Sequence, residues 1–441
     1  ARTAASLGKR VALVEQGPFG GLCILRGCMP SKTLIRSSEL AYLFRNSEPL
    51  GLKPGSLHID YPKIISRKNK IIAGFADYRF NEAKSNPCIS LVDGSARFVS
   101  PHEVEAGGRL LKGEKFVISA GSRVSVPDIP GLNETGFITS DQALELDRLP
   151  RSLAILGGGV IALELGQHFH RMGVKVYLLA RGGRLLRRED PVVGETICRI
   201  FQEEGMTVLT GAATESVSRG DEFKEVLFSY GGKRQTVSVD EILVATGRGP
   251  FLDRMNLEVT RVEQTNDGIV VNDEMETNVP GIFAAGDAAG IYKMAHIAVY
   301  QGEIAGHNAF SEKKRKADYR VVPEVIFTDP PYSRVGLSEE EAKALGIPVE
   351  VASYPYDDLG KAICTGQTTG FARLIAHAKS GEILGAQILG AESGAMIHEM
   401  AVALWYRATV HQFAQVPHFH PTLSEILTYP AEELALRIRG L

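Results

Sequence analysis

The feature that most constrains this chain is a strand–glycine turn–helix–strand unit near its middle. The apolar run Ser152 to Leu156 leads into GGGVIA (157–162), and a helical stretch continues to about Met172. Gly173 then breaks the helix, and Val174 to Leu179 forms the next strand. The turn fits G-x-G-x-x-A, in which small residues let the backbone approach a pyrophosphate at the helix N-terminus. The unit therefore predicts a parallel-sheet dinucleotide-binding domain, with the nucleotide lying against Gly157, Gly159 and Ala162.

The N-terminus contains part of a second such unit. Ala1 to Leu7 is typical of the end of a helix, Gly8 ends it, and Arg10 to Glu15 is typical of a buried parallel strand. An acidic residue closing such a strand binds ribose hydroxyls. The preceding strand and glycine turn are not in the sequence, so we expect it to start inside the first helix and to lack roughly 20–25 residues. Any targeting peptide would be lost with them.

Length and charge narrow the possible functions further. A chain of 441 residues is too long for one core and predicts two or three domains. The net charge of −3, with 23% charged residues, predicts no strong attraction to nucleic acid or to acidic membranes, and no apolar run approaches the length of a membrane span. The basic run 313–316 is typical of a solvated surface connection.

Later segments indicate how the domains follow one another. The strand ILVATGR within Val237 to Gly247 closes the central domain, and GIFAAGD, over Ile282 to Asp287, supplies a strand ending in a carboxylate. From about Val322 the pattern changes to strands such as Ala372 to Ile375 and Ile383 to Ile388, followed by a helix from about Gly394. That change predicts a third domain.

Two of the five cysteines stand close together in a glycine-rich setting. Cys23 and Cys28 have four residues between them, and Pro30 favours a helix that starts just after Cys28. A thiol at a helix N-terminus has a lowered pKa. A structural disulfide or a zinc ligand pair is the alternative, but no second ligand pair is evident and no metal site is expected. The remaining cysteines are isolated and are expected to be buried as small hydrophobes: Cys88, Cys198 and Cys364.

Six segments together resemble the class I pyridine nucleotide-disulfide oxidoreductases, the family of dihydrolipoamide dehydrogenase, glutathione reductase and mercuric reductase. The segments are GGLCILRGCMPSK (20–32), VISAGS (117–122), GGGVIALELG (157–166), ATGR (245–248), TNVPGIFAAGDAAG (277–290) and HPTLSE (420–425). The resemblance implies an α/β fold with two Rossmann-like domains, one for FAD (1–149 and 250–320) and one for NAD(P) (150–249). It also implies a C-terminal α+β dimerisation domain (321–441).

The resemblance also implies roles for six side chains. Cys28 would be the sulfur that faces the flavin, and Cys23 the interchange thiol that reacts with the substrate. His420 would act as acid or base in thiol exchange, oriented by Glu425, and family members supply this pair from the partner subunit of a homodimer. Lys32 and Glu164 would form an ion pair beside the flavin; without the family they would be a surface lysine and an ordinary helix residue. The neighbouring His411 and His418 are expected to have no catalytic role.

The expected FAD contacts extend over most of the chain. Glu15 would bind the adenosine ribose and Asp287 the ribityl–pyrophosphate region. The remaining positions expected at FAD are Gly21, Lys32, Ala96, Gly121, Met294, Ala295 and His296. Gly247 is expected at NAD(P).

The choice of nicotinamide depends on the end of the strand after Gly173. NAD-specific members place an acidic residue there, whereas this chain has Ala180. Arg181 and Arg187 match the phosphate-binding arginines of NADPH-dependent members, and a guanidinium suits a phosphate dianion. The alternative is a merely basic loop, since Arg184 and Arg188 lie there too. We therefore expect NADPH as the cofactor beside FAD, with NADH possible.

The sequence predicts an FAD-dependent NAD(P)H:disulfide oxidoreductase acting on a small-molecule or protein-bound disulfide, most like dihydrolipoamide dehydrogenase, in the cytoplasm. One alternative is metal-ion reduction of the mercuric reductase type, because LLARGGRLLRREDP resembles that enzyme. It would need a further cysteine pair near the C-terminus, and no cysteine follows Cys364. The other alternative is a non-enzymatic flavoprotein subunit.

Overall fold

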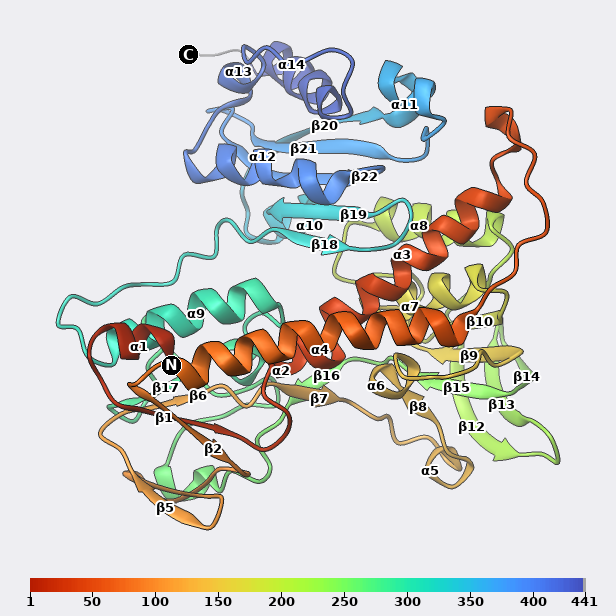
Figure 1. Cartoon of the computed structure of the whole chain (residues 1–441). Coiled ribbons are helices and arrows are strands. Elements are labelled where there is room, and N and C mark those ends of the chain that lie inside the picture. Colours follow the sequence, from red (N-terminus) through yellow and green to blue (C-terminus); the bar gives the residue numbers. More distant parts are fainter. Residues whose placement is uncertain (439–441) are drawn as a thin grey trace.

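A five-stranded parallel sheet with the order β11-β10-β9-β15-β8 forms the middle of the molecule in the computed structural model, which describes residues 1–438 (Figure 1). Every residue of the central strand β9 is buried, because a parallel sheet is covered on both faces. The sheet strands are β8 (Ile138–Thr139), β9 (Ser152–Leu156), β10 (Lys175–Ala180), β11 (Thr207–Thr210) and β15 (Glu241–Val244). The helices of this unit are α5 (Leu132–Thr135), α6 (Ser140–Ala143), α7 (Val160–Arg171) and α8 (Pro191–Glu203).

An antiparallel three-stranded sheet extends this unit between β11 and β15. Its strands are β12 (Ala213–Arg219), β13 (Lys224–Tyr230) and β14 (Lys233–Val239). Their buried residues pack with those of the parallel sheet, including Val217, Val226 and Phe228. The hairpins therefore cover one side of the five-stranded parallel sheet.

The N-terminal unit combines short parallel and antiparallel pairs. Strands β1 (Val11–Glu15) and β2 (Ile89–Asp93) are parallel, as are β6 (Phe116–Ile118) and β17 (Ile282–Ala284). An antiparallel sheet follows, made of β3 (Arg97–Ser100), β4 (Glu103–Ala106) and β5 (Arg109–Lys112). The antiparallel ribbon β7 (Ser122–Val124) and β16 (Arg248–Pro250) lies between this unit and the parallel sheet. The helices of the N-terminal unit are α1 (Arg2–Ser6), η2 (Leu257–Thr260), η3 (Gly286–Ala288) and α9 (Ala295–Asn308).

Two long helices, drawn in red-orange in Figure 1, cross the middle of the molecule. They are α3 (Cys28–Arg45), which follows the short α2 (Gly21–Arg26), and α4 (Tyr61–Ser85), with η1 (Glu48–Leu50) between them. Leu34 of α3 is fully buried in the core that includes Leu163 and Phe169 of α7. Helix α3 therefore joins the N-terminal unit to the central sheet.

The C-terminal unit is an antiparallel sheet with the order β18-β19-β22-β21-β20. Its strands are β18 (Glu324–Ile326), β19 (Tyr332–Gly336), β20 (Val349–Pro355), β21 (Phe371–His377) and β22 (Ile383–Leu389). The helices are α10 (Glu339–Ala344), η4 (Tyr356–Asp358), α11 (Gly360–Thr365), α12 (Ser393–Trp405), α13 (Val410–Phe413), η5 (Ser424–Leu427) and α14 (Thr428–Arg437). A separate core of buried residues from β21, β22, α12 and α14 holds it together.

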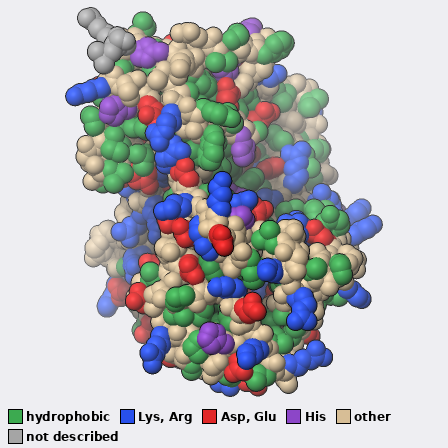
Figure 2. Space-filling model, turned by 90° about the vertical axis from the view of Figure 1, so that its left-hand side faces the viewer, with side chains coloured by type: hydrophobic (Ala, Val, Ile, Leu, Met, Phe, Trp, Pro, Cys, Tyr) green, Lys and Arg blue, Asp and Glu red, His purple; other side chains and the backbone are tan. Residues whose placement is uncertain are grey.

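Two predicted strands are shorter in the structure. The strand predicted in ILVATGR ends at Val244. The strand predicted over Ile282 to Asp287 ends at Ala284, and Asp287 lies in the short helix η3 that follows it. Among the described residues, no helix combines the length and the apolar character needed to cross a membrane. On the face drawn in Figure 2, Lys and Arg side chains are interspersed with Asp and Glu side chains.

Candidate active site

The two neighbouring cysteines lie on either side of a tight turn between two helices. Cys23 is in α2, and Cys28 is the first residue of the 18-residue α3. A Cβ atom at Gly27 would lie 2.9 Å from the Leu22 carbonyl oxygen and 3.2 Å from Cys23 Cα, so only glycine permits this approach. Both thiols are free and partly buried. The turn brings the two side chains into contact with each other. The prediction that the three isolated cysteines are buried was wrong, because Cys88 and Cys198 are only partly buried and Cys364 is exposed.

Their environment separates the acidities of the two thiols. The hydrogen bond from Cys23 and the charge of Lys32 lower the pKa of Cys28 to about 6, although burial opposes this. The same hydrogen bond, followed by burial, raises the pKa of Cys23. The N-terminus of α3 favours negative charge on Cys28 as well. Of the two thiols, Cys28 is therefore the more acidic.

An ion pair lies behind the cysteines at the contact of α3 with α7. Lys32 Nζ is 2.7 Å from Glu164 Oε2, and the Glu164 side chain is only 5% exposed. The second oxygen of Glu164 accepts a hydrogen bond of 3.0 Å from the Phe327 N–H, which belongs to the C-terminal unit. The Lys32 ammonium also lies 4.6 Å from the centroid of the Phe327 ring. Phe327 was not a sequence candidate, because nothing in its neighbourhood along the chain indicates this contact.

His420 and Glu425 form a second pair, in the C-terminal unit. His420 Nδ1 lies 2.8 Å from Glu425 Oε1, and the Thr422 N–H donates to Glu425 Oε2 at 2.8 Å. Burial raises the pKa of Glu425, but the Thr422 N–H and His420 outweigh it and leave that pKa lowered. The His420 side chain is 78% exposed. The two other histidines nearby make structural contacts, His411 with the Ile438 carbonyl and His418 with Glu399.

The elements that flank His420 and the helix that carries Cys23 lie in different parts of the molecule. Figure 1 places α13 and α14, which flank His420, at the top of the molecule and α2 below its middle. Next to His420, Phe419 is 79% exposed, and Tyr406 after α12 is 77% exposed. An exposed imidazole next to an exposed aromatic side chain is suited to a contact with another molecule.

Two carboxylates stand at the carboxyl ends of parallel strands in the N-terminal unit. Glu15 ends β1, and Asp287 lies in η3 directly after β17. Asp287 accepts a hydrogen bond from Ser122, whose hydroxyl oxygen in turn accepts one of 2.8 Å from Arg248 Nε. Carboxyl ends of parallel strands are where dinucleotides bind. Ser122 and Arg248 were not predicted from the sequence, although both belong to the recognised segments.

The remaining candidates of this unit surround the same strand ends. Helix α9 starts after Met294 and has no side-chain cap at its N-terminus, so its first backbone N–H groups are open to an anion. A groove of about 860 Å³ opens beside Glu15, lined in part by Gln16, Gly17 and Asp93. The others lie as follows: Gly21 opens α2, Ala96 is partly buried before β3, Gly121 has a φ of +75° before β7, and Ala295 and His296 form the first turn of α9.

The nucleotide-type turn of the central sheet is formed as the spacing predicts. Gly157 and Gly159 connect β9 to α7, and Ala162 is fully buried in the first turn of α7. Gly247 follows β15, and its carbonyl accepts the Ser125 N–H. The basic loop that begins at Arg181 follows β10 directly. Arg181 and Arg187 are exposed, and neither has an ion-pair partner among residues 1–438.

Comparison with known proteins gives these features a family. Residues 1–302 match the pyridine nucleotide-disulphide oxidoreductase family, and residues 322–431 match its dimerisation domain. The chain belongs to the pyridine nucleotide-disulphide oxidoreductases. This membership makes it an FAD-dependent oxidoreductase of class I that uses a pyridine nucleotide, and the dimerisation domain supports a homodimer. The predicted fold class is confirmed.

Two kinds of oxidoreductase are about equally similar to this chain in sequence. A mercuric reductase of Bacillus cereus is 33% identical over 96% of this chain and 67% of its own length. A dihydrolipoyl dehydrogenase of Geobacillus stearothermophilus is 33% identical over 97% of this chain and 92% of its own length. Among solved structures, the HOCl-induced flavoprotein disulfide reductase RclA of Escherichia coli has a TM-score of 0.86 at 30% identity, covering 98% of this chain and 95% of that chain.

The residues of the N-terminal unit fit FAD. Glu15 and Asp287 offer carboxylates to hydroxyl groups, and the open N-terminus of α9 offers N–H groups to phosphate. Lys32, held by Glu164, supplies a positive charge beside the thiolate of Cys28. These carboxylate, N–H and lysine groups suit a flavin dinucleotide.

Proposed function

We propose that this chain is an NADPH-preferring dithiol–disulfide oxidoreductase, most like dihydrolipoyl dehydrogenase, whose redox pair is Cys23 and Cys28. The observation that supports it best is the difference between the pKa values of the two thiols, with Cys28, the first residue of α3, as the thiolate. FAD, when bound, supplies two-electron transfer between the nicotinamide and this cysteine pair. Everything else in the reaction is thiol and proton chemistry of the chain's own residues.

The thiol exchange follows from the two cysteines and the histidine pair. In the direction of disulfide reduction, the Cys23 sulfur loses its proton to His420 and attacks one sulfur of the substrate disulfide. A mixed disulfide forms, and the second substrate sulfur leaves as a thiolate that takes a proton from His420. Cys28 then attacks Cys23, which restores the Cys23–Cys28 disulfide and releases the first substrate sulfur. Since His420 is exposed and belongs to the C-terminal unit, whereas Cys23 lies in α2, the proposal assigns this histidine to the partner's cysteine pair.

The nucleotide preference rests on the basic loop after β10. Ala180, at the end of that strand, is buried and has no carboxylate for a ribose hydroxyl, whereas Arg181 and Arg187 are exposed beside it. A 2′-phosphate adds about two negative charges near neutral pH, which paired guanidinium donors can bind. The proposal therefore favours NADPH over NADH.

Steady-state kinetics with a panel of acceptors tests the proposal. Lipoamide, glutathione disulfide and mercuric ion would each be assayed with NADPH and with NADH, on the FAD-loaded dimer. Lipoamide turnover with the higher kcat/KM for NADPH is the expected result. If no disulfide were turned over, the proposed disulfide chemistry would be contradicted. A clear preference for NADH would contradict the proposed nucleotide preference.

Metal-ion reduction is the second candidate, and the relatives favour it. Mercuric reductases are among the similar proteins, and RclA was solved as a Cu(II) complex. Against it, no cysteine follows Cys364 in the sequence, and the described residues hold no group of three or more His, Cys, Asp or Glu side chains arranged for a metal ion. A soft metal ion would therefore have to reach Cys23 and Cys28 without a second cysteine pair to deliver it. Mercuric ion in the acceptor panel separates this candidate from disulfide reduction.

A further inference from the structure

The basic loop after β10 (residues 181–190) has an unusual backbone conformation that requires contacts to stabilise it. Leu186 takes a φ of +48°, a left-handed conformation that is rare for a bulky residue. Its N–H donates to the Gly158 carbonyl at 3.0 Å, and the Glu189 N–H donates back to the Leu186 carbonyl at 2.8 Å. The loop is thereby folded against the glycine turn where the nucleotide is expected.

One arginine of the loop, Arg184, contacts the C-terminal unit. Arg184 donates to the carbonyl oxygens of Arg187 and Glu189 at 3.1 and 3.2 Å, and to Glu340 Oε2 of α10 at 2.9 Å. This contact separates Arg184 from Arg181 and Arg187, which are exposed. A Cβ atom at Gly182 would lie 2.5 Å from Arg187 Cδ, so the glycine leaves room for the Arg187 side chain to lie across the loop.

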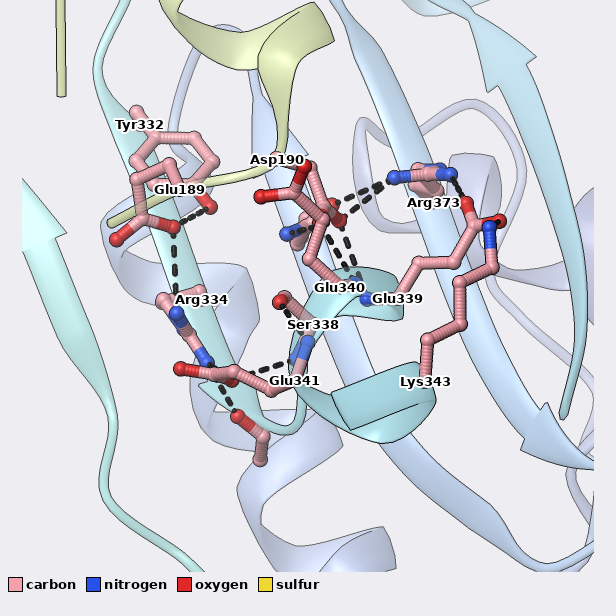
Figure 3. A network of polar contacts seen from close by, with 12 residues as sticks. Glu189, Asp190, Tyr332, Arg334, Ser338, Glu339, Glu340, Glu341, Lys343 and Arg373 are labelled. Carbon is pink, nitrogen blue, oxygen red and sulfur yellow. Dashed lines mark hydrogen bonds and ion pairs between the residues drawn. The ribbon is translucent and has the colours of Figure 1, made fainter. Parts of the chain in front are cut away.

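Two buried carboxylates at the end of the loop fasten it to the same C-terminal unit (Figure 3). Glu189 accepts a hydrogen bond of 2.6 Å from the Tyr332 hydroxyl and lies 3.4 Å from Arg334. Asp190 is 2% exposed. It accepts hydrogen bonds from the N–H groups of Glu339 and Glu340, from Gln387 at 2.9 Å and from Arg373 at 2.7 Å. Such satisfied buried carboxylates fix the backbone that carries them.

We propose that the C-terminal unit positions the nucleotide-binding arginines: the Arg184–Glu340 pair, supported by Glu189 and Asp190, holds the loop in the shape that presents Arg181 and Arg187 to the 2′-phosphate. The inference rests on the proposed NADPH preference. It assigns Arg184 and Glu340 as positioning residues, since Glu340 repels a phosphate and can favour its binding only through the loop. The alternative, in which Arg184 itself binds phosphate, makes the opposite prediction for the loss of Glu340.

Glu340→Gln tests the inference on the FAD-loaded dimer, with Glu203→Gln as the matched control. Glu203 also pairs with an arginine on the protein surface, Arg199, and both residues belong to α8, outside the loop. Amide hydrogen exchange of the peptide 181–190 and calorimetric affinities for 2′,5′-ADP and 5′-AMP are measured. We expect faster exchange and an affinity for 2′,5′-ADP that is roughly two- to fivefold weaker, the range of one partly exposed ion pair. The affinity for 5′-AMP, and all values of the control variant, should stay unchanged.

The other outcomes overturn the inference in distinguishable ways. Unchanged exchange in Glu340→Gln would show that the pair does not hold the loop. Faster exchange with an unchanged or tighter affinity for 2′,5′-ADP would show that the shape of the loop does not matter to the phosphate, or that Arg184 binds it directly. If the unaltered protein bound 2′,5′-ADP no more tightly than 5′-AMP, the NADPH preference itself would fail, and the positioning role would fail with it.

Discussion

The cysteine half and the histidine half of the proposed active site differ in how complete they are within one chain. Cys28 forms a hydrogen bond with Cys23 and lies near the charge of Lys32, which is paired with the almost fully buried Glu164. Around His420 there is one supporting carboxylate, Glu425, and the imidazole itself is exposed. One chain supplies all the groups of the cysteine half. Among residues 1–438, the histidine half of the same chain has no thiol beside it on which His420 could act.

This difference indicates what each half requires. A thiolate needs nearby positive charge and a fixed helix terminus, which a single chain can supply through α3 and α7. An acid–base histidine needs only a fixed tautomer and access to the reacting sulfur, and Glu425 provides the first of these. Substitutions in the cysteine half should therefore act within their own chain, and those in the histidine half across the dimer.

The largest effect is expected from the cysteines. Cys28→Ser and Cys23→Ser should each reduce disulfide turnover by more than about a thousandfold, because a serine hydroxyl forms no disulfide with the remaining thiol. NADPH-dependent reduction of lipoamide is the measurement. Residual turnover within tenfold of the unaltered protein in either variant would show that the pair is structural.

His420→Ala comes next, with an expected loss of about 10²–10⁴-fold, the usual contribution of a general acid–base group. Mixing His420→Ala chains with Cys23→Ser chains should then restore part of the activity, because such a heterodimer holds one intact pair of halves. No recovery in a purified heterodimer would place both halves of the site in the same chain. His418→Ala is the neighbouring control, and it should retain far more activity.

Arg181 lies outside both halves of the site. Arg181→Ala should therefore have a smaller effect, limited to the binding of the nucleotide. The loss of one partly exposed charge-assisted contact should raise the KM for NADPH by about tenfold and leave the KM for NADH nearly unchanged. Both values come from steady-state kinetics with saturating disulfide. Equal changes for the two nucleotides would mean that Arg181 does not contact the 2′-phosphate.

Lys32→Met should have the mildest effect on the thiol chemistry. The positive charge of Lys32 contributes to lowering the pKa of Cys28 to about 6, so its loss should raise that pKa. Since a lowered thiol pKa means thiolate above it, alkylation of Cys28 should reach half its maximal rate near pH 6 in the unaltered protein and at a higher pH in the variant. The test is iodoacetamide alkylation of the reduced protein across pH 5–9, followed by mass spectrometry of the Cys28 peptide. An unchanged midpoint would exclude Lys32 as a cause.

The sequence was most informative where the signal is local. The strand Ser152–Leu156 and the turn after it follow from an apolar run and three glycines, and β9 has those bounds. The Lys32–Glu164 and His420–Glu425 contacts were expected from the family resemblance, and both pairs are within hydrogen-bonding distance in the structure. Phe327 could not be predicted, because its backbone N–H reaches Glu164 across 163 residues of chain.

Long-range contacts also explain what was missed in the basic loop. The family resemblance selected Arg181 and Arg187, and it gave Arg184 no role beyond belonging to a basic loop. The distinction comes from α10, whose Glu340 lies 156 residues further along the chain. Similarly, ILVATGR continues as an apolar pattern, yet β15 ends at Val244 because the chain turns there toward the ribbon formed by β7 and β16.

The two helices that carry the cysteines are anchored very differently. Helix α3 has 18 residues, six of them buried, and near its far end Arg45 donates to the Arg171 carbonyl. Helix α2 has six residues and none is buried. Because local displacement costs least where few buried contacts are lost, we expect α2, with Cys23, to be displaced more readily than α3, with Cys28. In the proposed reaction, the sulfur that attacks the substrate then lies on the less anchored helix, which leaves room for bulky disulfides.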